Sequence, residues 1–197
     1  MARPQQVSDN EILETARRCF LEQGPSVSTD VIADSLGVSS QALFKRFGSK
    51  RDLMLAAIRP PAVPPWTASL EAGPNDQPLR IQLAAIVEEV SVYFAEMARR
   101  MSLVRWSGVP IEDLLREYDP PPPQIGIRAL AQWLQRAHQQ NLIRETDFQS
   151  VATALLGSLH APVFLAEVLQ QKQTPQARKA YVTEVVNLFA RGLEPHT

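Results

Sequence analysis

The fold of this chain depends on residues 28–50, which read STDVIADSLGVSSQALFKRFGSK. This stretch predicts two short helices joined by a tight turn. Small Ala33 allows the two helices to approach closely, and Gly37 can adopt the positive φ that such a turn needs. Val38 is expected to be buried at the corner, and Leu43 to pack the second helix against the first. The pattern predicts a helix-turn-helix.

Basic residues are concentrated in the second of these helices and just after it. Between positions 39 and 51 the chain has Lys45, Arg46, Lys50 and Arg51 and no acidic residue. The formal net charge of the whole chain is −1, so the remainder of the chain is net acidic. A local positive patch, rather than the total charge, sets the attraction to phosphates. The charge distribution therefore favours nucleic-acid binding by this segment.

Composition is typical of a globular protein. The chain has 197 residues, of which 45% are hydrophobic, enough for one large or two small domains with a proper core. No apolar run approaches the roughly 18 residues needed to cross a bilayer, and the N-terminus lacks the apolar segment of a signal peptide. The single cysteine, Cys19, excludes an internal disulfide. We expect a soluble, cytoplasmic protein that does not bind membranes.

Capping patterns place further helices around the central segment. Ser8 begins a capping box, and the amphipathic helix that follows is expected to end near Gly24 and to cover the helix-turn-helix. Ser28, Ser39 and Ser49 are the expected N-caps of the next three helices. The helix capped by Ser39, the third in the chain, is short and makes about two turns up to residue 45.

Two proline-rich stretches, at residues 59–66 and at residues 119–123 (DPPPP), interrupt the helical pattern. The prolines of RPPAVPPW, residues 59–66, stop the fourth helix; a proline-rich ligand for a partner domain is the alternative interpretation. Apolar residues at helical spacing then predict only helices, with no strand and no repeat. These helices are expected at 79–103, 111–118 and 124–141, from 147 onward and from 174 onward. The chain is therefore expected to be all-α, with domains at 1–58 and 79–197 and a linker at 59–78.

Residues 12–58 resemble the DNA-binding domain of TetR-type transcriptional regulators. The resemblance lies in IADSLGVSSQALFKRFGSKRDLMLAAI, with Phe44, Phe47, Ser49 and Lys50 at the family's positions. It implies an N-terminal helix-turn-helix domain followed by a helical ligand-binding and dimerisation domain. It also implies a homodimeric repressor that binds a palindromic operator and is released by a small molecule.

The third helix offers base-reading side chains near its N-terminus. Gln41 can form a bidentate pair with adenine, Ala42 can contact a thymine methyl group, and Lys45 can reach a base or a phosphate. Other residues are expected to contact the DNA backbone. The candidate DNA-binding residues are Ser28, Thr29, Ser39, Ser40, Gln41, Ala42, Phe44, Lys45, Arg46 and Lys50. As alternatives, Ser28 and Ser39 are only helix caps and Arg46 is a solvated charge.

Lys50 and Arg51 occupy the first positions of the fourth helix. The helix dipole disfavours cations there by about 0.3–1 kcal/mol each. A DNA phosphate would relieve this conflict.

Two half-sites require two reading heads about 34–36 Å apart, so a rigid homodimer is expected. The final two helices have apolar stripes that suit a four-helix interface. The candidate interface residues are Leu155, Leu159, Val163, Val182, Val185 and Phe189. The alternative is that these stripes fill the core of the monomer.

Bulky residues in the second domain are candidates for a pocket that takes an apolar or aromatic effector. They are Phe94, Met97, Met101, Trp106, Trp133, His160 and Phe164; the alternative for each is a core position. The histidines lack metal-ligand spacing, and no catalytic constellation is present, so neither a metal, a cofactor nor an enzyme activity is expected. The expected partners are double-stranded DNA, a second copy and a small molecule of unknown identity. The alternative function is a DNA-bound structural or interaction protein that senses no small molecule.

Overall fold

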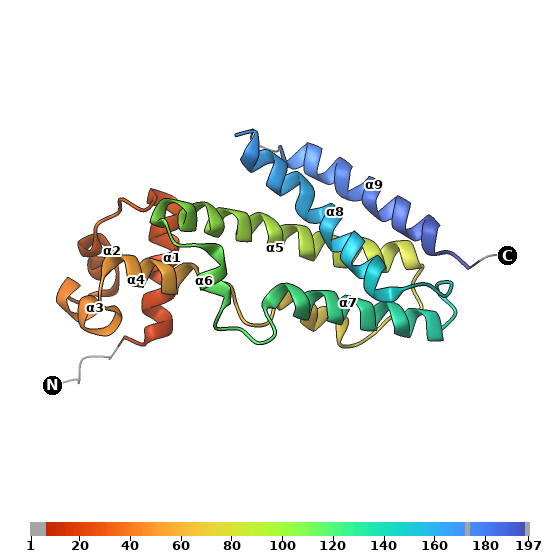
Figure 1. Cartoon of the computed structure of the whole chain (residues 1–197), viewed down its shortest axis with the longest axis horizontal. Helices are drawn as coiled ribbons and strands as arrows, with labels where there is room; N and C mark the ends of the chain where they lie inside the picture. Colours follow the sequence, from red (N-terminus) through yellow and green to blue (C-terminus); the bar gives the residue numbers. More distant parts are fainter. Residues whose placement is uncertain (1–6, 172–173, 196–197) are drawn as a thin grey trace. The chain divides into compact units, whose positions relative to one another are not determined.

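The computed structural model describes residues 7–171 and 174–195, and in these residues it contains helices and no strand (Figure 1). The chain divides into two units. The first comprises Met1–Pro60 with Arg99–Glu117, and the second comprises Pro61–Ala98 with Tyr118–Thr197. The expected all-α fold is confirmed.

The first unit begins with four helices that are each started by a serine. The helices are α1 (Asp9–Gln23), α2 (Thr29–Leu36), α3 (Ser40–Phe47) and α4 (Lys50–Ile58). Each serine side chain accepts a hydrogen bond from a backbone N–H three residues later, which satisfies a donor that has no partner inside the helix. These caps are the predicted ones: Ser8, Ser28, Ser39 and Ser49.

The core of the first unit is formed mainly where α1 packs against α4. Phe20 of α1 and Leu53 and Ile58 of α4 are almost fully buried. Leu103 and Val104 also belong to this core and come from the end of α5 (Leu79–Ser107). Leu114 of α6 (Ile111–Leu115) joins them. Residues 1–58 therefore do not contain all of the core that they pack around. Apolar spacing in the sequence does not show which distant helix completes this core.

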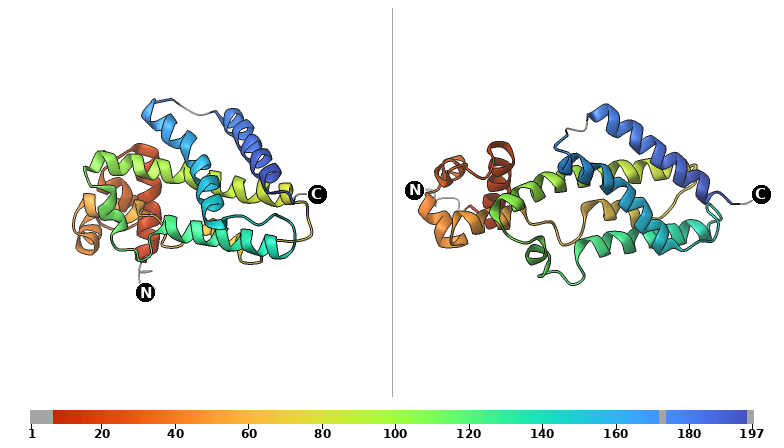
Figure 2. Two further views of the ribbon diagram at one scale, coloured as in Figure 1. Left: turned by 45° about the vertical axis from the view of Figure 1, so that its right-hand side comes forward. Right: turned by 45° about the horizontal axis from the view of Figure 1, so that its top comes forward.

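The second unit contains the first part of α5 together with η1 (Pro65–Leu70), α7 (Pro122–Gln139), α8 (Phe148–Val168) and α9 (Pro175–Leu193). Helix α8 packs along α7 on one side and lies beside α9 on the other (Figure 2). The centre of this unit is an apolar cluster to which all of these elements contribute. Its most deeply buried members include Leu70, Leu83, Val87, Leu130, Leu134 and Leu155.

The proline-rich segment 59–78 is not a free linker. Trp66 and Leu70 of η1 are buried in the core of the second unit. The Trp66 ring lies so close to Gly126 of α7 that a Cβ at this glycine would be 2.8 Å from Cζ2 of the indole. Arg136 of α7 donates a hydrogen bond of 2.9 Å to the carbonyl of Glu71 and another to the carbonyl of Leu70. The prolines end α4, but the tryptophan that follows them anchors the segment to the core.

The second proline run, residues 119–123, leads directly into a helix. Helix α7 begins at Pro122 rather than at the expected residue 124. Proline is tolerated in the first turn of a helix because the N–H that it lacks has no partner there. Helix α5 extends to Ser107, beyond the expected end at residue 103.

One helix is more apolar than the sequence interpretation allowed. Residues Phe148–Ala166 of α8 have a mean hydropathy of 1.3 and are long and apolar enough to cross a membrane by length and composition. This corrects the expectation that no segment reaches that length. One helix of this kind is weak evidence for a membrane span, because core helices of soluble proteins meet the same criterion.

Candidate nucleic-acid interface

The turn between α2 and α3 has the geometry that the sequence predicts. Gly37 adopts φ 65° and ψ 28°, which is the left-handed region, and its N–H donates to the carbonyls of Ala33 and Asp34. The Val38 N–H donates to the Ala33 carbonyl at 3.1 Å. Leu43 of α3 is fully buried, whereas Val38 is only half-buried. These contacts fix the direction in which α3 leaves the turn.

Helix α3 buries Leu43 and leaves its opposite side exposed. Gln41, Phe44 and Lys45 are exposed, and their spacing of three and four residues places them on one face. Ser40 and Ala42 are half-buried beside them. This face therefore presents an amide, an aromatic ring and a cation together, which suits contact with base edges and phosphates.

Basic side chains near this face are available for an external anion. Lys45, Lys50 and Arg51 form no salt bridge with any described residue. Lys50 is the first residue of α4, whose N-terminus is closed by Ser49 in a capping box with Asp52. Cations at a helix N-terminus are electrostatically unfavourable in the free protein, so an incoming phosphate would relieve this repulsion.

Arg46 contacts the start of α1 in the free protein. Its guanidinium donates to the backbone carbonyl of Val7 at 2.6 Å and to the Asp9 carboxylate at 3.2 Å. These bonds tie α3 to the start of α1, and the predicted contact of Arg46 with a DNA phosphate stays a prediction. Asp9 lies 37 residues earlier in the sequence, so local spacing could not reveal the pair.

Ser40 also has a partner that sequence reasoning missed. Its hydroxyl donates a hydrogen bond to the Asp30 carboxylate in the first turn of α2. The predicted contacts Ser28 and Ser39 accept hydrogen bonds from the N–H groups of Val31 and Ala42, so both act as caps. Thr29 is the first residue of α2 and is half-buried.

Most residues of the predicted dimer stripes are buried within the chain itself. Leu155, Leu159, Val182 and Val185 are buried in the core of the second unit, while Val163 and Phe189 are half-buried. The monomer's own core therefore covers four of the six residues, and the interface formed by these stripes stays a prediction. The exposed apolar residues of α8, α9 and the turn between them are Phe164, Leu165, Val168, Leu169, Tyr181 and Leu188.

The predicted ligand-binding residues are divided between the two units. Phe94 and His160 make an edge-to-face contact with their ring centres 5.6 Å apart. Trp133 is buried in the core of the second unit, whereas Met101 packs against the core of the first. Phe164 is exposed and Met97 is half-buried; the Trp106 side chain lies outside the described residues.

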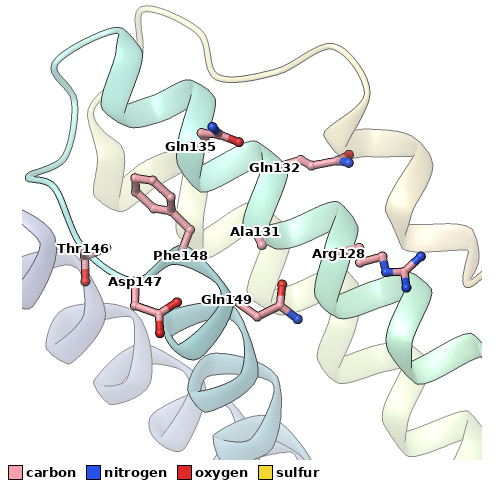
Figure 3. Close-up of a pocket in the computed structure, with 8 residues that line it drawn as sticks. All are labelled: Arg128, Ala131, Gln132, Gln135, Thr146, Asp147, Phe148 and Gln149. Atoms are coloured by element: carbon pink, nitrogen blue, oxygen red, sulfur yellow. The ribbon is translucent and has the colours of Figure 1, made fainter.

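A surface groove lies between α7 and the start of α8, and none of the predicted ligand-binding residues lines it (Figure 3). Its volume is about 440 Å³, and it is lined by Arg128, Ala131, Gln132, Gln135, Thr146, Asp147, Phe148 and Gln149. Hydrogen bonds from the side chain and backbone of Ser150 lower the pKa of the Asp147 carboxyl. Among the described residues, no three His, Cys, Asp or Glu side chains cluster in a way that could hold a metal ion.

The first unit thus defines a helix-turn-helix protein with a cationic, partly aromatic reading face. Residues 12–57 match the family model for bacterial regulatory proteins of the tetR family, and residues 108–192 match the C-terminal domain of AefR-like transcriptional repressors. The chain belongs to the TetR family of DNA-binding transcriptional regulators. A comparison with curated proteins finds no significant match.

Solved structures share the fold along nearly the whole chain. A TetR-family regulator from Mesorhizobium loti superimposes with a TM-score of 0.73 at 19% identity and covers 95% of this chain and 96% of its own. The flavonoid-responsive regulator FrrA gives a TM-score of 0.56 at 24% identity, covering 94% and 96%. The fatty acid degradation regulator FadR from Bacillus halodurans gives 0.60 at 16% identity, covering 94% and 97%.

Proposed function

We propose that the chain is a homodimeric repressor that binds a palindromic operator and is released by a small apolar or aromatic ligand. The observation that supports DNA reading most directly is the exposed face of α3. Gln41, Phe44 and Lys45 project from a helix whose other side is fixed by buried Leu43. The similarity of residues 108–192 to AefR-like repressors supports repression rather than activation.

The proposed dimer uses the exposed apolar residues near the end of α8 and on α9. Phe164, Leu165 and Val168 lie within two turns of α8, and Leu188 of α9 is 69% exposed. Exposed apolar side chains grouped in this way mark interaction surfaces. A twofold axis through this face would give each half-site its own reading head.

Two variants test the proposed interface. Leu188→Glu should convert the dimer to a monomer in sedimentation analysis and weaken operator binding, because a carboxylate would be buried there without a partner. Val63→Glu places the same charge at another exposed apolar residue and should leave the dimer intact. A Leu188→Glu protein that sediments like the wild type would contradict this interface.

The effector is proposed to be apolar or aromatic because the second unit is rich in such side chains. Phe94, Trp133 and His160 lie within it, and two solved structures of the same fold are a flavonoid-responsive regulator and a fatty acid degradation regulator. A thermal-shift screen with flavonoids and acyl compounds tests this proposal, since a ligand that binds the folded state raises Tm.

A second candidate is a DNA-bound interaction protein that senses no small molecule. The observation in its favour is that none of the predicted ligand-binding residues lines the groove between α7 and α8. A gel shift with the DNA that flanks the chain's own gene separates the possibilities. The ligand-responsive repressor releases the DNA when an effector from the screen is added, whereas the interaction protein retains it. Absence of binding at low salt would contradict both.

A further inference from the structure

An acidic residue contacts the reading helix at a position where DNA binding would disfavour negative charge. Asp30 lies in the first turn of α2, and Ser40 is the first residue of α3. The Ser40 hydroxyl donates its hydrogen bond to the Asp30 carboxylate. Asp30 is exposed and Ser40 is half-buried, so the pair lies at the surface beside the reading face.

This contact determines what Ser40 can offer to DNA. A serine hydroxyl has one proton to donate and two lone pairs that accept, whereas an ionised carboxylate only accepts. Because the Ser40 proton is directed at Asp30, the oxygen presents only lone pairs to any other group. Ser40 paired with Asp30 is therefore a hydrogen-bond acceptor.

A hydrogen-bond acceptor in the major groove separates the four bases into two pairs. Adenine and cytosine present amino donors there, at N6 and N4, while guanine O6 and thymine O4 are acceptors. Phosphate oxygens are also acceptors, so an acceptor-only hydroxyl gains nothing from them. Without Asp30, the same hydroxyl could rotate and donate to guanine, thymine or a phosphate.

We propose that Asp30 is a specificity-determining residue that acts through Ser40, so that one position in each half-site selects adenine or cytosine over guanine or thymine. This inference rests on the proposed function of α3 as the reading helix. Asp30 is a positioning residue here, because the contact with the base is made by Ser40. Its negative charge also opposes attraction to phosphates, so its presence lowers affinity while raising selectivity.

The experiment is a selection from a randomised duplex DNA library with the full chain. Wild type, Asp30→Ala, Ser40→Ala and the double variant are compared by sequencing the bound DNA. Wild type should enrich a motif in which one position per half-site prefers adenine or cytosine by roughly two- to tenfold, the range that one net hydrogen bond supports. Each single variant should lose this preference, and the double variant should lose no more than either.

Asp34→Ala is the matched control. Asp34 is an exposed carboxylate on the same helix, and its side chain bonds to no described residue. Removing either carboxylate should tighten binding to all sequences through charge, but only Asp30→Ala should change the base preference. Circular dichroism verifies that each variant folds; should Asp30→Ala fail to fold, Ser40→Ala alone must still lose the preference.

Two results would overturn the inference while leaving the proposed function intact. One is a wild-type motif whose adenine or cytosine preference persists in Asp30→Ala or Ser40→Ala. The other is an equal loss of preference in Asp34→Ala, which would assign the effect to charge alone. If the wild-type chain enriches no sequence at all, the proposed operator binding fails and this inference fails with it.

Discussion

Lys50 should stabilise the DNA complex and destabilise the free protein. It is the first residue of α4, and its ammonium forms no salt bridge with a described residue. The helix dipole penalises a cation at this position by about 0.3–1 kcal/mol. Lys50→Met removes the charge, keeps most of the apolar stem and has a similar helix propensity. The free energy of unfolding should therefore rise by about 0.5 kcal/mol at low salt.

The same substitution should weaken DNA binding in a specific way. A lost phosphate contact lowers the slope of log K against log salt by about one for each subunit, and so by about two for a dimer. The weakening should be similar for all DNA sequences, because phosphate contacts carry no base information.

Urea denaturation at two salt concentrations measures the stability change, and fluorescence anisotropy with labelled duplex DNA measures the salt slope. The stability gain should shrink at high salt because ions screen the repulsion. Arg18→Met, which removes an exposed cation from α1, is the control with the same change in net charge. An unchanged slope would refute the assignment of Lys50 as a phosphate contact, and a variant less stable than wild type would refute the predicted dipole penalty.

Three further predictions concern the folded units. Gly37→Ala should lower the free energy of unfolding in urea by about 1–2 kcal/mol, because φ is 65° while a Cβ there meets no atom within 4 Å; Gly37→Asn should cost less. Gly126→Ala should lower the free energy of unfolding by about 1–3 kcal/mol, because the added Cβ would overpack against Trp66. Gly157 lies within α8, where an added Cβ would meet open space, so Gly157→Ala should raise the free energy of unfolding. The N-cap serine of α1 lowers the pKa of the Glu11 carboxyl through hydrogen bonds from its backbone and side chain. Glu11 therefore contributes stability above its unfolded pKa of about 4.5, and this contribution is lost as the pH falls through the lower folded pKa. In Glu11→Gln, the free energy of unfolding measured against pH should fall less steeply on the acid side.

Local features of the sequence predicted the reading head well. Serine caps act over three residues and a left-handed glycine acts on its own turn, so neither depends on distant parts of the chain. Ser39 and Gly37 accordingly take the roles that the sequence indicated. The all-α class followed from the same kind of information, because helical periodicity is visible within each segment.

Features that depend on distant neighbours could not be predicted. Periodicity showed that Leu155 and Val182 lie on apolar stripes, but it could not show that the monomer's own core covers those stripes. The partner of Arg46 lies 37 residues away and that of Ser40 lies 10 residues away. Trp66 follows a proline run that predicts a linker, and only the position of α7 shows that its ring is buried.

The central claim is that α3 reads DNA as one of two heads in a dimer. The most direct measurement is the stoichiometry and salt dependence of binding to a duplex enriched from a randomised library. We expect a palindromic motif with half-sites about one helical turn apart, two chains bound to each duplex, and affinity that falls steeply as salt rises. A single chain on a non-repeated site, or no enrichment at low salt, would contradict it.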